Sequence, residues 1–128
     1  TALYKGPDHI DKSLMTTVRV LRKDKDISRI EIHGHSGYAA EGEDIVCAAI
    51  TSAVRYAEVI LNEVLHLDVK FTANHDKAFL SFSRTSLSAY GSDATVGDAV
   101  FEGFARYMKE LSAEYPDYIK VMEVQQDA

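Results

Sequence analysis

The chain has 128 residues, 46% of them hydrophobic and 27% charged, which is typical of one globular domain. Its formal net charge is −6 and it has no basic run, so we expect no direct contact with nucleic acid. No apolar run approaches the roughly 20 residues that span a bilayer, so no membrane partner is expected. Cys47 is the only cysteine and cannot form an internal disulfide, which favours a reducing cytoplasm.

Residues 1–14 differ in pattern from the rest of the chain. They contain Gly6-Pro7, their charges cancel, and they show no sustained periodicity. An alternating pattern begins at Met15. We expect Met15 to be the native start, with residues 1–14 a leader added for expression or a flexible arm, and residues 15–128 to form a single domain.

Two strands open this domain. Residues 17–22 alternate and are rich in β-branched side chains, residues 23–26 form a polar turn, and residues 28–35 form the second strand of an antiparallel hairpin. Because successive side chains point to opposite faces of a strand, Ile30 and Ile32 share one face, whereas Glu31, His33 and His35 share the other.

The next element is a long helix. Asp44 is of the residue type that caps a helix N-terminus, and the apolar periodicity continues to about His66. Two apolar stripes run along it: Ile45, Ala49, Ser52, Ala53, Tyr56, Ile60 and Val64, and Val46, Ile50, Ala57, Leu61 and Leu65. So wide an apolar surface predicts packing on two sides, one against the sheet and the second against another subunit.

The remaining residues predict two short strands, a helix and a final strand. The two short strands are residues 67–72 and 78–83, which flank a predicted hairpin turn. The helix starts at Thr95 and ends before Pro116, and the last strand is residues 118–124. The element order is then ββαββαβ. It predicts an α+β fold in which a mixed, largely antiparallel sheet packs with two helices.

Cys47 and His35 are the residues that suggest chemistry. If Asp44 caps the helix, Cys47 lies in its first turn, where the helix dipole favours a thiolate by roughly 0.3–1 kcal/mol. That is less than the roughly 1.4 kcal/mol of one pKa unit, so a potent nucleophile requires the His35 imidazole beside it. The intervening loop, Ser36–Glu43, contains Gly37 and follows Gly34, and is long enough to act as a lid.

Other interpretations of the same residues remain open. A lone cysteine flanked by Val46 and Ala48 is also typical of a buried packing residue, or of a redox-sensing thiol. His33, His35, Asp44 and Cys47 could instead bind zinc, although the spacing of these residues is poor evidence for a metal site.

The segment from Gly34-His35 to Gly42-Glu43-Asp44-Ile45-Val46-Cys47-Ala48-Ala49 closely resembles the signature of the bacterial ribosomal-processing cysteine protease (Prp) family. That signature pairs Gly-His with Gly-x-Asp-Ile-Val-Cys-Ala at the same spacing of His and Cys. A second segment, Glu114-Tyr115-Pro116-Asp117-Tyr118-Ile119-Lys120, resembles the family's closing Pro-x-Tyr-Ile. The resemblance extends from Met15 to about Val124.

The resemblance implies a cytoplasmic endopeptidase that removes a short N-terminal extension from a large-subunit ribosomal protein. It implies that Cys47 is the nucleophile, that His35 is the general base and later the acid, and that no metal or cofactor takes part. Gly34, Asp44 and Thr51 match positions that shape the family's site, although the family usually has serine in place of Thr51. The family also forms homodimers.

A non-catalytic ribosome-associated assembly factor is the alternative to the protease. Such a factor would bind the same ribosomal partner but would not need the Cys47 thiol. Replacing Cys47 should therefore abolish the function of a protease but leave that of an assembly factor intact.

Overall fold

The computed structural model describes residues 15–34, 41–74, 76–84 and 92–126, and for residues 41–44 and 92 it describes the backbone alone. Its elements follow the predicted ββαββαβ order, which confirms the α+β class. They are β1 (Thr16–Lys23), β2 (Asp26–His33), α1 (Glu41–Glu58), η2 (Val59–Val64), β3 (Lys70–Asn74), β4 (Phe79–Ser83), α2 (Ser92–Glu114) and β5 (Ile119–Gln126). The residues predicted to be a leader, 1–14, lie outside the described part of the chain.

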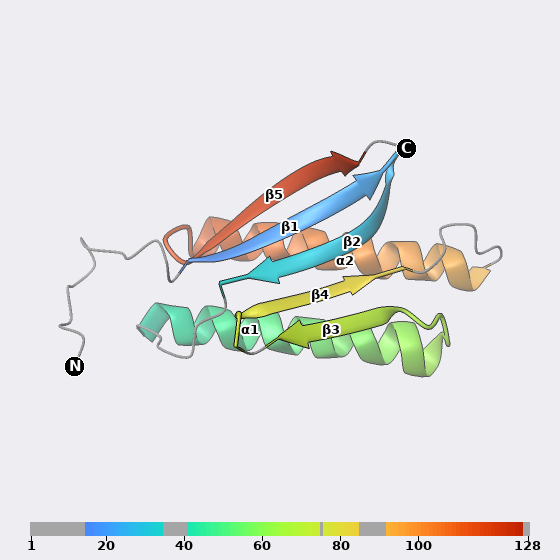
Figure 1. Cartoon of the computed structure of the whole chain (residues 1–128), viewed down its shortest axis with the longest axis horizontal. Coiled ribbons are helices and arrows are strands. Elements are labelled where there is room, and N and C mark those ends of the chain that lie inside the picture. The colour runs from blue at the N-terminus through green and yellow to red at the C-terminus, as the bar shows by residue number, and fades with distance from the viewer. Residues whose placement is uncertain (1–14, 35–40, 75, 85–91, 127–128) are drawn as a thin grey trace.

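The five strands form one sheet in the order β3-β4-β2-β1-β5. Three of the neighbouring pairs are antiparallel, and β5 runs parallel to β1. This confirms a mixed, largely antiparallel sheet. Figure 1 shows α1 and α2 side by side behind the same face of this sheet, and no helix of the described residues covers the other face.

The hydrophobic core lies between this sheet face and the two helices. Its centre is Phe82 on β4, which is fully buried and lies 5.0 Å from the ring of Phe71, 5.4 Å from Phe101 and 5.0 Å from Phe104. Ile30 and Ile32 are buried there, as their alternation predicts, whereas Glu31 and His33 point to the opposite face.

Several boundaries differ from the sequence prediction. The first helix begins at Glu41, so Asp44 is its fourth residue and the prediction that Asp44 caps it is wrong. The last residues of the predicted loop, 41–43, are therefore helical, and α2 likewise starts at Ser92 instead of Thr95. Acidic residues are favourable throughout the first turn of a helix, so their presence does not mark one starting residue.

α1 continues without a break into a π-helix, η2. The N–H of Leu65 donates to the carbonyl of Ile60 at 2.9 Å, a spacing of five residues that defines this wider turn. Just beyond it, the side chain of Asn62 donates to the carbonyl of Val69 and accepts from the N–H of Val69. These two bonds fix the chain as it enters β3.

Ile45–Val64 is long and apolar enough to cross a membrane by length and composition alone, contrary to the expectation that no such run exists. A core helix of a soluble protein passes the same test. Val46, Ile50 and Leu61 on this helix are at most 3% exposed and belong to the core between helix and sheet. Packing in the core accounts for the apolar character of this side of the helix.

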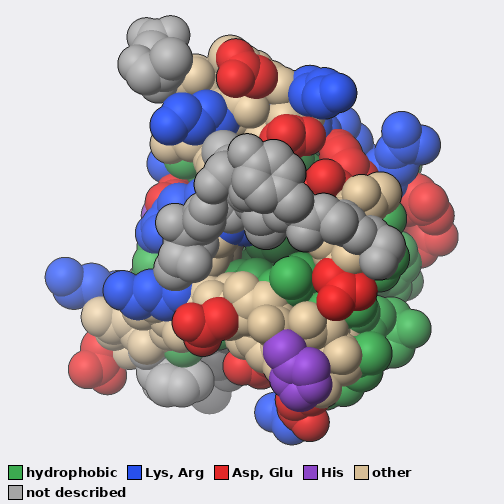
Figure 2. Space-filling view, turned by 90° about the vertical axis from the view of Figure 1, so that its right-hand side faces the viewer, with side chains coloured by type: hydrophobic (Ala, Val, Ile, Leu, Met, Phe, Trp, Pro, Cys, Tyr) green, Lys and Arg blue, Asp and Glu red, His purple; other side chains and the backbone are tan. Residues whose placement is uncertain are grey.

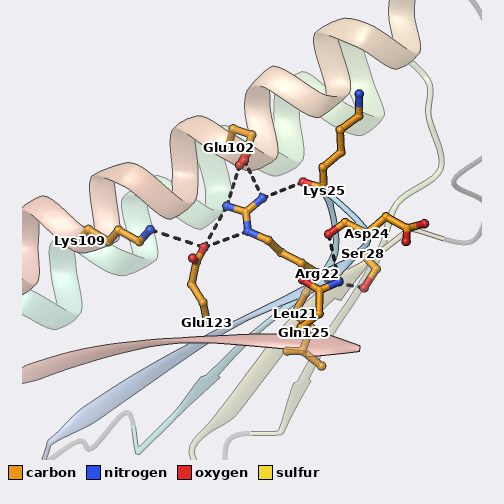
Figure 3. Close-up of polar contacts among 9 residues, drawn as sticks. All are labelled: Leu21, Arg22, Asp24, Lys25, Ser28, Glu102, Lys109, Glu123 and Gln125. Carbon is orange, nitrogen blue, oxygen red and sulfur yellow. Dashed lines mark hydrogen bonds and ion pairs between the residues drawn. The ribbon is translucent and has the colours of Figure 1, made fainter. Parts of the chain in front are cut away.

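An ion-pair network joins α2 to β1 and β5 on the helix-covered side (Figure 3). The Arg22 guanidinium donates to Glu102 at 2.8 and 3.0 Å and to Glu123 at 2.9 and 3.0 Å, and Lys109 lies 3.5 Å from Glu123. The hydrogen bond to Glu102 is the main cause that raises the pKa of Arg22. Burial alone would raise the pKa of Glu123, but its hydrogen bond with Arg22 and the charges of Arg22 and Lys109 lower it overall.

We expect Arg22→Met to lower the free energy of unfolding by about 1–2 kcal/mol, because both glutamates are partly exposed and water screens the loss. Urea unfolding at neutral pH measures this change. Arg106→Met, which removes an exposed arginine of α2, should change stability by less than about 0.5 kcal/mol.

The destabilisation by Arg22→Met should depend on pH. Because the folded-state pKa of Glu123 is lowered, its contribution is present above the ordinary glutamate pKa and disappears as pH falls through the folded value. The difference between wild type and Arg22→Met should therefore narrow in acid. A difference that is independent of pH would assign the effect to packing of the arginine stem instead.

Candidate active site

Gly34 lies where β2 ends and the chain leaves the sheet. Its φ of +83° is in the region that glycine adopts readily, and its N–H donates to the carbonyl of Ala78 at 2.9 Å. A Cβ at this position would come within 2.6 Å of the carbonyl oxygen of Met15, a backbone atom. Position 34 therefore requires glycine on two independent grounds.

Cys47 lies on α1, at the end of the molecule where β2 ends (Figure 1). It is the seventh residue of the helix, so it belongs to the second turn and not to the first as predicted. There the backbone N–H groups already pair within the helix, and the dipole acts more weakly. Cys47 is 8% exposed and adjoins Val46 in the core, and burial disfavours a charged thiolate. Ionisation at this position depends on a cation beside the sulfur.

His35, the residue predicted to supply that cation, lies outside the described residues, as does most of the predicted lid. Its pairing with Cys47 stays a prediction. Asp44 lies within α1, three residues before Cys47. Thr51 lies one helical turn beyond Cys47 and is exposed. Gly34 thus follows the end of β2, whereas Asp44, Cys47 and Thr51 lie at helical spacing along α1.

His33 lies apart from this junction, on the sheet face opposite the helices. Its ring contacts Phe79, with 4.8 Å between the centroids, and its Nε2 lies 3.2 Å from Oε1 of Glu31. Because α1 and Cys47 are on the other face, His33 is not placed to join Cys47 in a zinc site. Among the described residues, no cluster of His, Cys, Asp and Glu side chains could hold a metal ion.

Glu31 is the centre of a charged cluster that the sequence analysis did not single out. Its carboxylate accepts from Arg29 at 2.7 Å and from Arg19 at 2.8 Å, in addition to its contact with His33. Burial would raise the pKa of Glu31, but the bonds from Arg29 and His33 and the charges of Arg29 and Arg19 lower it overall. The alternation of β1 and β2 places these residues on one face, but only the strand register shows that they meet.

Comparison with known proteins identifies the family. A family model described as cysteine protease Prp matches residues 15–120, which include both His35 and Cys47. No curated protein matches the sequence.

Solved structures share the fold. SMU.848 from Streptococcus mutans superposes with a TM-score of 0.77 at 19% identity, covering 90% of this chain and 98% of that chain. The essential ribosomal processing protease Prp from S. aureus, in complex with a substrate peptide, superposes with a TM-score of 0.72 at 13% identity, covering 85% of this chain and 99% of that one. These structural likenesses concern the fold, whereas the family model matches the sequence over most of its length, so the chain belongs to the cysteine protease Prp family.

Proposed function

We propose that this protein is a cysteine endopeptidase that removes the N-terminal extension of a large-subunit ribosomal protein. The observation that carries the proposal is that β2, which immediately precedes Gly34, ends at the end of the molecule where α1, the helix that bears Cys47, begins. The family match and the substrate peptide bound to the S. aureus relative support the reaction class.

The proposed mechanism is acyl transfer through a thioester. The Cys47 thiolate attacks the carbonyl carbon of the scissile peptide, and the C–N bond breaks as the His35 imidazolium protonates the leaving amine. His35 then takes a proton from water, the resulting hydroxide attacks the thioester, and the C–S bond breaks to regenerate the thiolate. The oxyanion formed in each step needs hydrogen-bond donors, and these must come from outside the second turn of α1, because the backbone N–H groups of that turn already pair within the helix.

Gly34, Asp44 and Thr51 have supporting roles in this proposal. Gly34, which directly precedes His35, supplies the positive φ with which the chain leaves β2. Asp44 lies one turn before Cys47, and Thr51 lies one turn after it, on the same side of α1. Thr51 retains the hydroxyl of the serine that the family usually has there.

The proposed substrate is a ribosomal protein precursor, which a cytoplasmic enzyme would meet during ribosome assembly. Ribosomal proteins are typically basic, and the formal net charge of −6 on this chain favours their encounter by long-range attraction. The reaction requires neither metal nor cofactor.

We further propose that the protein is a homodimer formed through the outer side of α1 and η2. Four large apolar side chains are exposed there: Ile45 by 51%, Tyr56 by 71%, Val59 by 43% and Val64 by 64%. Figure 2 shows hydrophobic side chains gathered at the lower right, the side to which the helices are turned. Of the four exposed residues, Ile45, Tyr56 and Val64 belong to the first predicted apolar stripe. Most residues of the second stripe are buried in the core.

Replacing the proposed nucleophile or base should abolish cleavage while leaving substrate binding intact. With a peptide that spans the leader junction, Cys47→Ala and His35→Ala should each reduce turnover by at least about 1,000-fold, as measured by mass spectrometry of the products. Ser112→Ala, a polar change on α2, serves as the control and should retain full activity. Cleavage that survives Cys47→Ala would contradict the protease proposal, and peptide binding with no cleavage by wild type would favour the assembly factor.

Gly34→Ala should impair both folding and turnover. The added Cβ must displace the Met15 carbonyl, and alanine must adopt the positive φ of this position. We therefore expect a loss of about 1–3 kcal/mol in unfolding free energy. Gly103→Ala is the matched control, because nothing lies within 4 Å of a Cβ there and alanine favours a helix by about 0.5–1 kcal/mol. Chemical denaturation of both variants measures the difference. Equal stability would show that the chain at Gly34 has no fixed path.

Tyr56→Glu should convert the dimer to a monomer, because it places a charge in the proposed apolar interface. Sedimentation velocity at several protein concentrations measures the change. Tyr107→Glu makes the same substitution on α2, where the tyrosine is 42% exposed, and should leave the dimer unchanged. A wild-type monomer, or a Tyr56→Glu dimer, would contradict the proposed interface.

A further inference from the structure

The sheet face that no described helix covers has a composition unlike that of the whole chain. Because directly paired residues share a face, the strand registers align three rows across the five strands. We call these residues the open face: Lys120, Thr17, His33, Phe79 and Asn74 in the first row; Met122, Arg19, Glu31, Ser81 and Thr72 in the second; Val124, Leu21, Arg29, Ser83 and Lys70 in the third.

The open face is basic although the chain is acidic. Its charged residues are Lys70, Arg29, Arg19 and Lys120, from four different strands, with Glu31 as the one carboxylate among them. Figure 2 shows Lys and Arg side chains gathered at the left, the side to which the strands are turned. Because the open face carries a net positive charge, the rest of the chain must be more negative than −6.

Glu31 pairs with both arginines, and its single negative charge cannot neutralise the two positive charges. Its side chain is 13% exposed, whereas Arg19 and Arg29 are 38% and 34% exposed. Each guanidinium contacts Glu31 through one nitrogen in the bonds among the described residues. A guanidinium has five N–H donors in a planar fork, so each arginine has donors beyond the one that contacts Glu31, and this fork suits phosphate.

Aromatic rings lie in the adjoining row. His33, with 43% of its side chain exposed, contacts the partly exposed Phe79 edge to face with 4.8 Å between the centroids. Aromatic rings on a sheet surface beside arginines often bind unpaired nucleic-acid bases by stacking. Such stacking accepts any base, because every base has a π-face.

We propose that the open face binds single-stranded RNA, with phosphates contacted by Arg19, Arg29, Lys70 and Lys120 and a base stacked at His33 and Phe79. The charge complementarity and the aromatic pair carry this proposal. It goes beyond the proteolytic function and does not depend on Cys47. His33 directly precedes Gly34, so RNA bound here would lie next to the end of β2, where a ribosomal substrate still attached to RNA would be presented.

This proposal reverses the expectation drawn from composition. The sequence has no basic run because the four cationic residues come from positions 19, 29, 70 and 120, each separated by long segments. Strand pairing brings them together. A net charge of −6 describes the sum over the molecule and not the potential above one face.

Fluorescence anisotropy of a labelled oligouridine of about twelve nucleotides tests the proposal directly. At about 50 mM salt the full-length wild type should bind with a micromolar dissociation constant. The logarithm of affinity should fall against the logarithm of salt concentration with a slope of about −2 to −3, as expected for four phosphate contacts on a single strand.

Charge-matched double variants separate the open face from bulk electrostatics. Lys70→Ala with Lys120→Ala should weaken binding about 10-fold and reduce the slope by about one. Arg55→Ala with Arg106→Ala removes the same charge from exposed positions on the helices and should change affinity by less than about twofold. Phe79→Leu should weaken binding about 3- to 10-fold without changing the slope, because it removes stacking and not charge.

Three outcomes would overturn the proposal. In the first, wild type does not bind oligouridine at low salt, and in the second, both double variants weaken binding equally. In the third, oligouridine does not bind while Lys70→Ala with Lys120→Ala slows cleavage of the leader peptide, which would assign the open face to a protein segment. Normal peptide cleavage alongside absent RNA binding would leave the protease function standing on its own.

Discussion

The constraint on which this structure depends is that both helices pack against the same face of one sheet. Phe82 lies at the centre of that contact, with rings from β3 and α2 around it. One consequence is that α1 begins at the end of the sheet where β2 ends, so the end of β2 and the first turns of α1, which include Cys47, lie at the same end of the molecule. A second is that two surfaces lack a covering layer within the described chain: the outer side of α1, which is apolar, and the far face of the sheet, which is charged.

These two uncovered surfaces are maintained by different physics. The outer side of α1 exposes large apolar side chains, which the proposed dimer would bury. The sheet face is instead satisfied internally, because Glu31 engages Arg19, Arg29 and His33 and so fixes long side chains over the strands. The first surface therefore favours a permanent partner, and the second is compatible with a protein that binds and releases a charged ligand.

Local patterns predicted most of the fold. Alternation identified β1 and β2, and the 3.6-residue period identified both helices, because these signals depend on neighbours in sequence. The predicted starting residue of α1 was wrong, because several acidic residues near this end are each compatible with a first helical turn. Contacts with the rest of the fold decide which residue begins the helix. The parallel pairing of β5 with β1 depends on residues about a hundred positions apart, as does the Arg22–Glu123 ion pair, so no local pattern could reveal either. The candidate site was predicted through the family motif, whereas the Glu31 cluster required the strand register.

The π-helical turn at Val59–Val64 has a consequence for how the chain can change in length. A π turn contains about one residue more than an α turn, and each residue of a helix rotates the following side chains by about 100°. Deleting one residue here would restore α geometry but turn Asn62 away from Val69 and displace the entry to β3. Inserting one would have a similar effect in the opposite direction. This segment should therefore keep its length even where its side chains vary, and gaps in an alignment of relatives should avoid it.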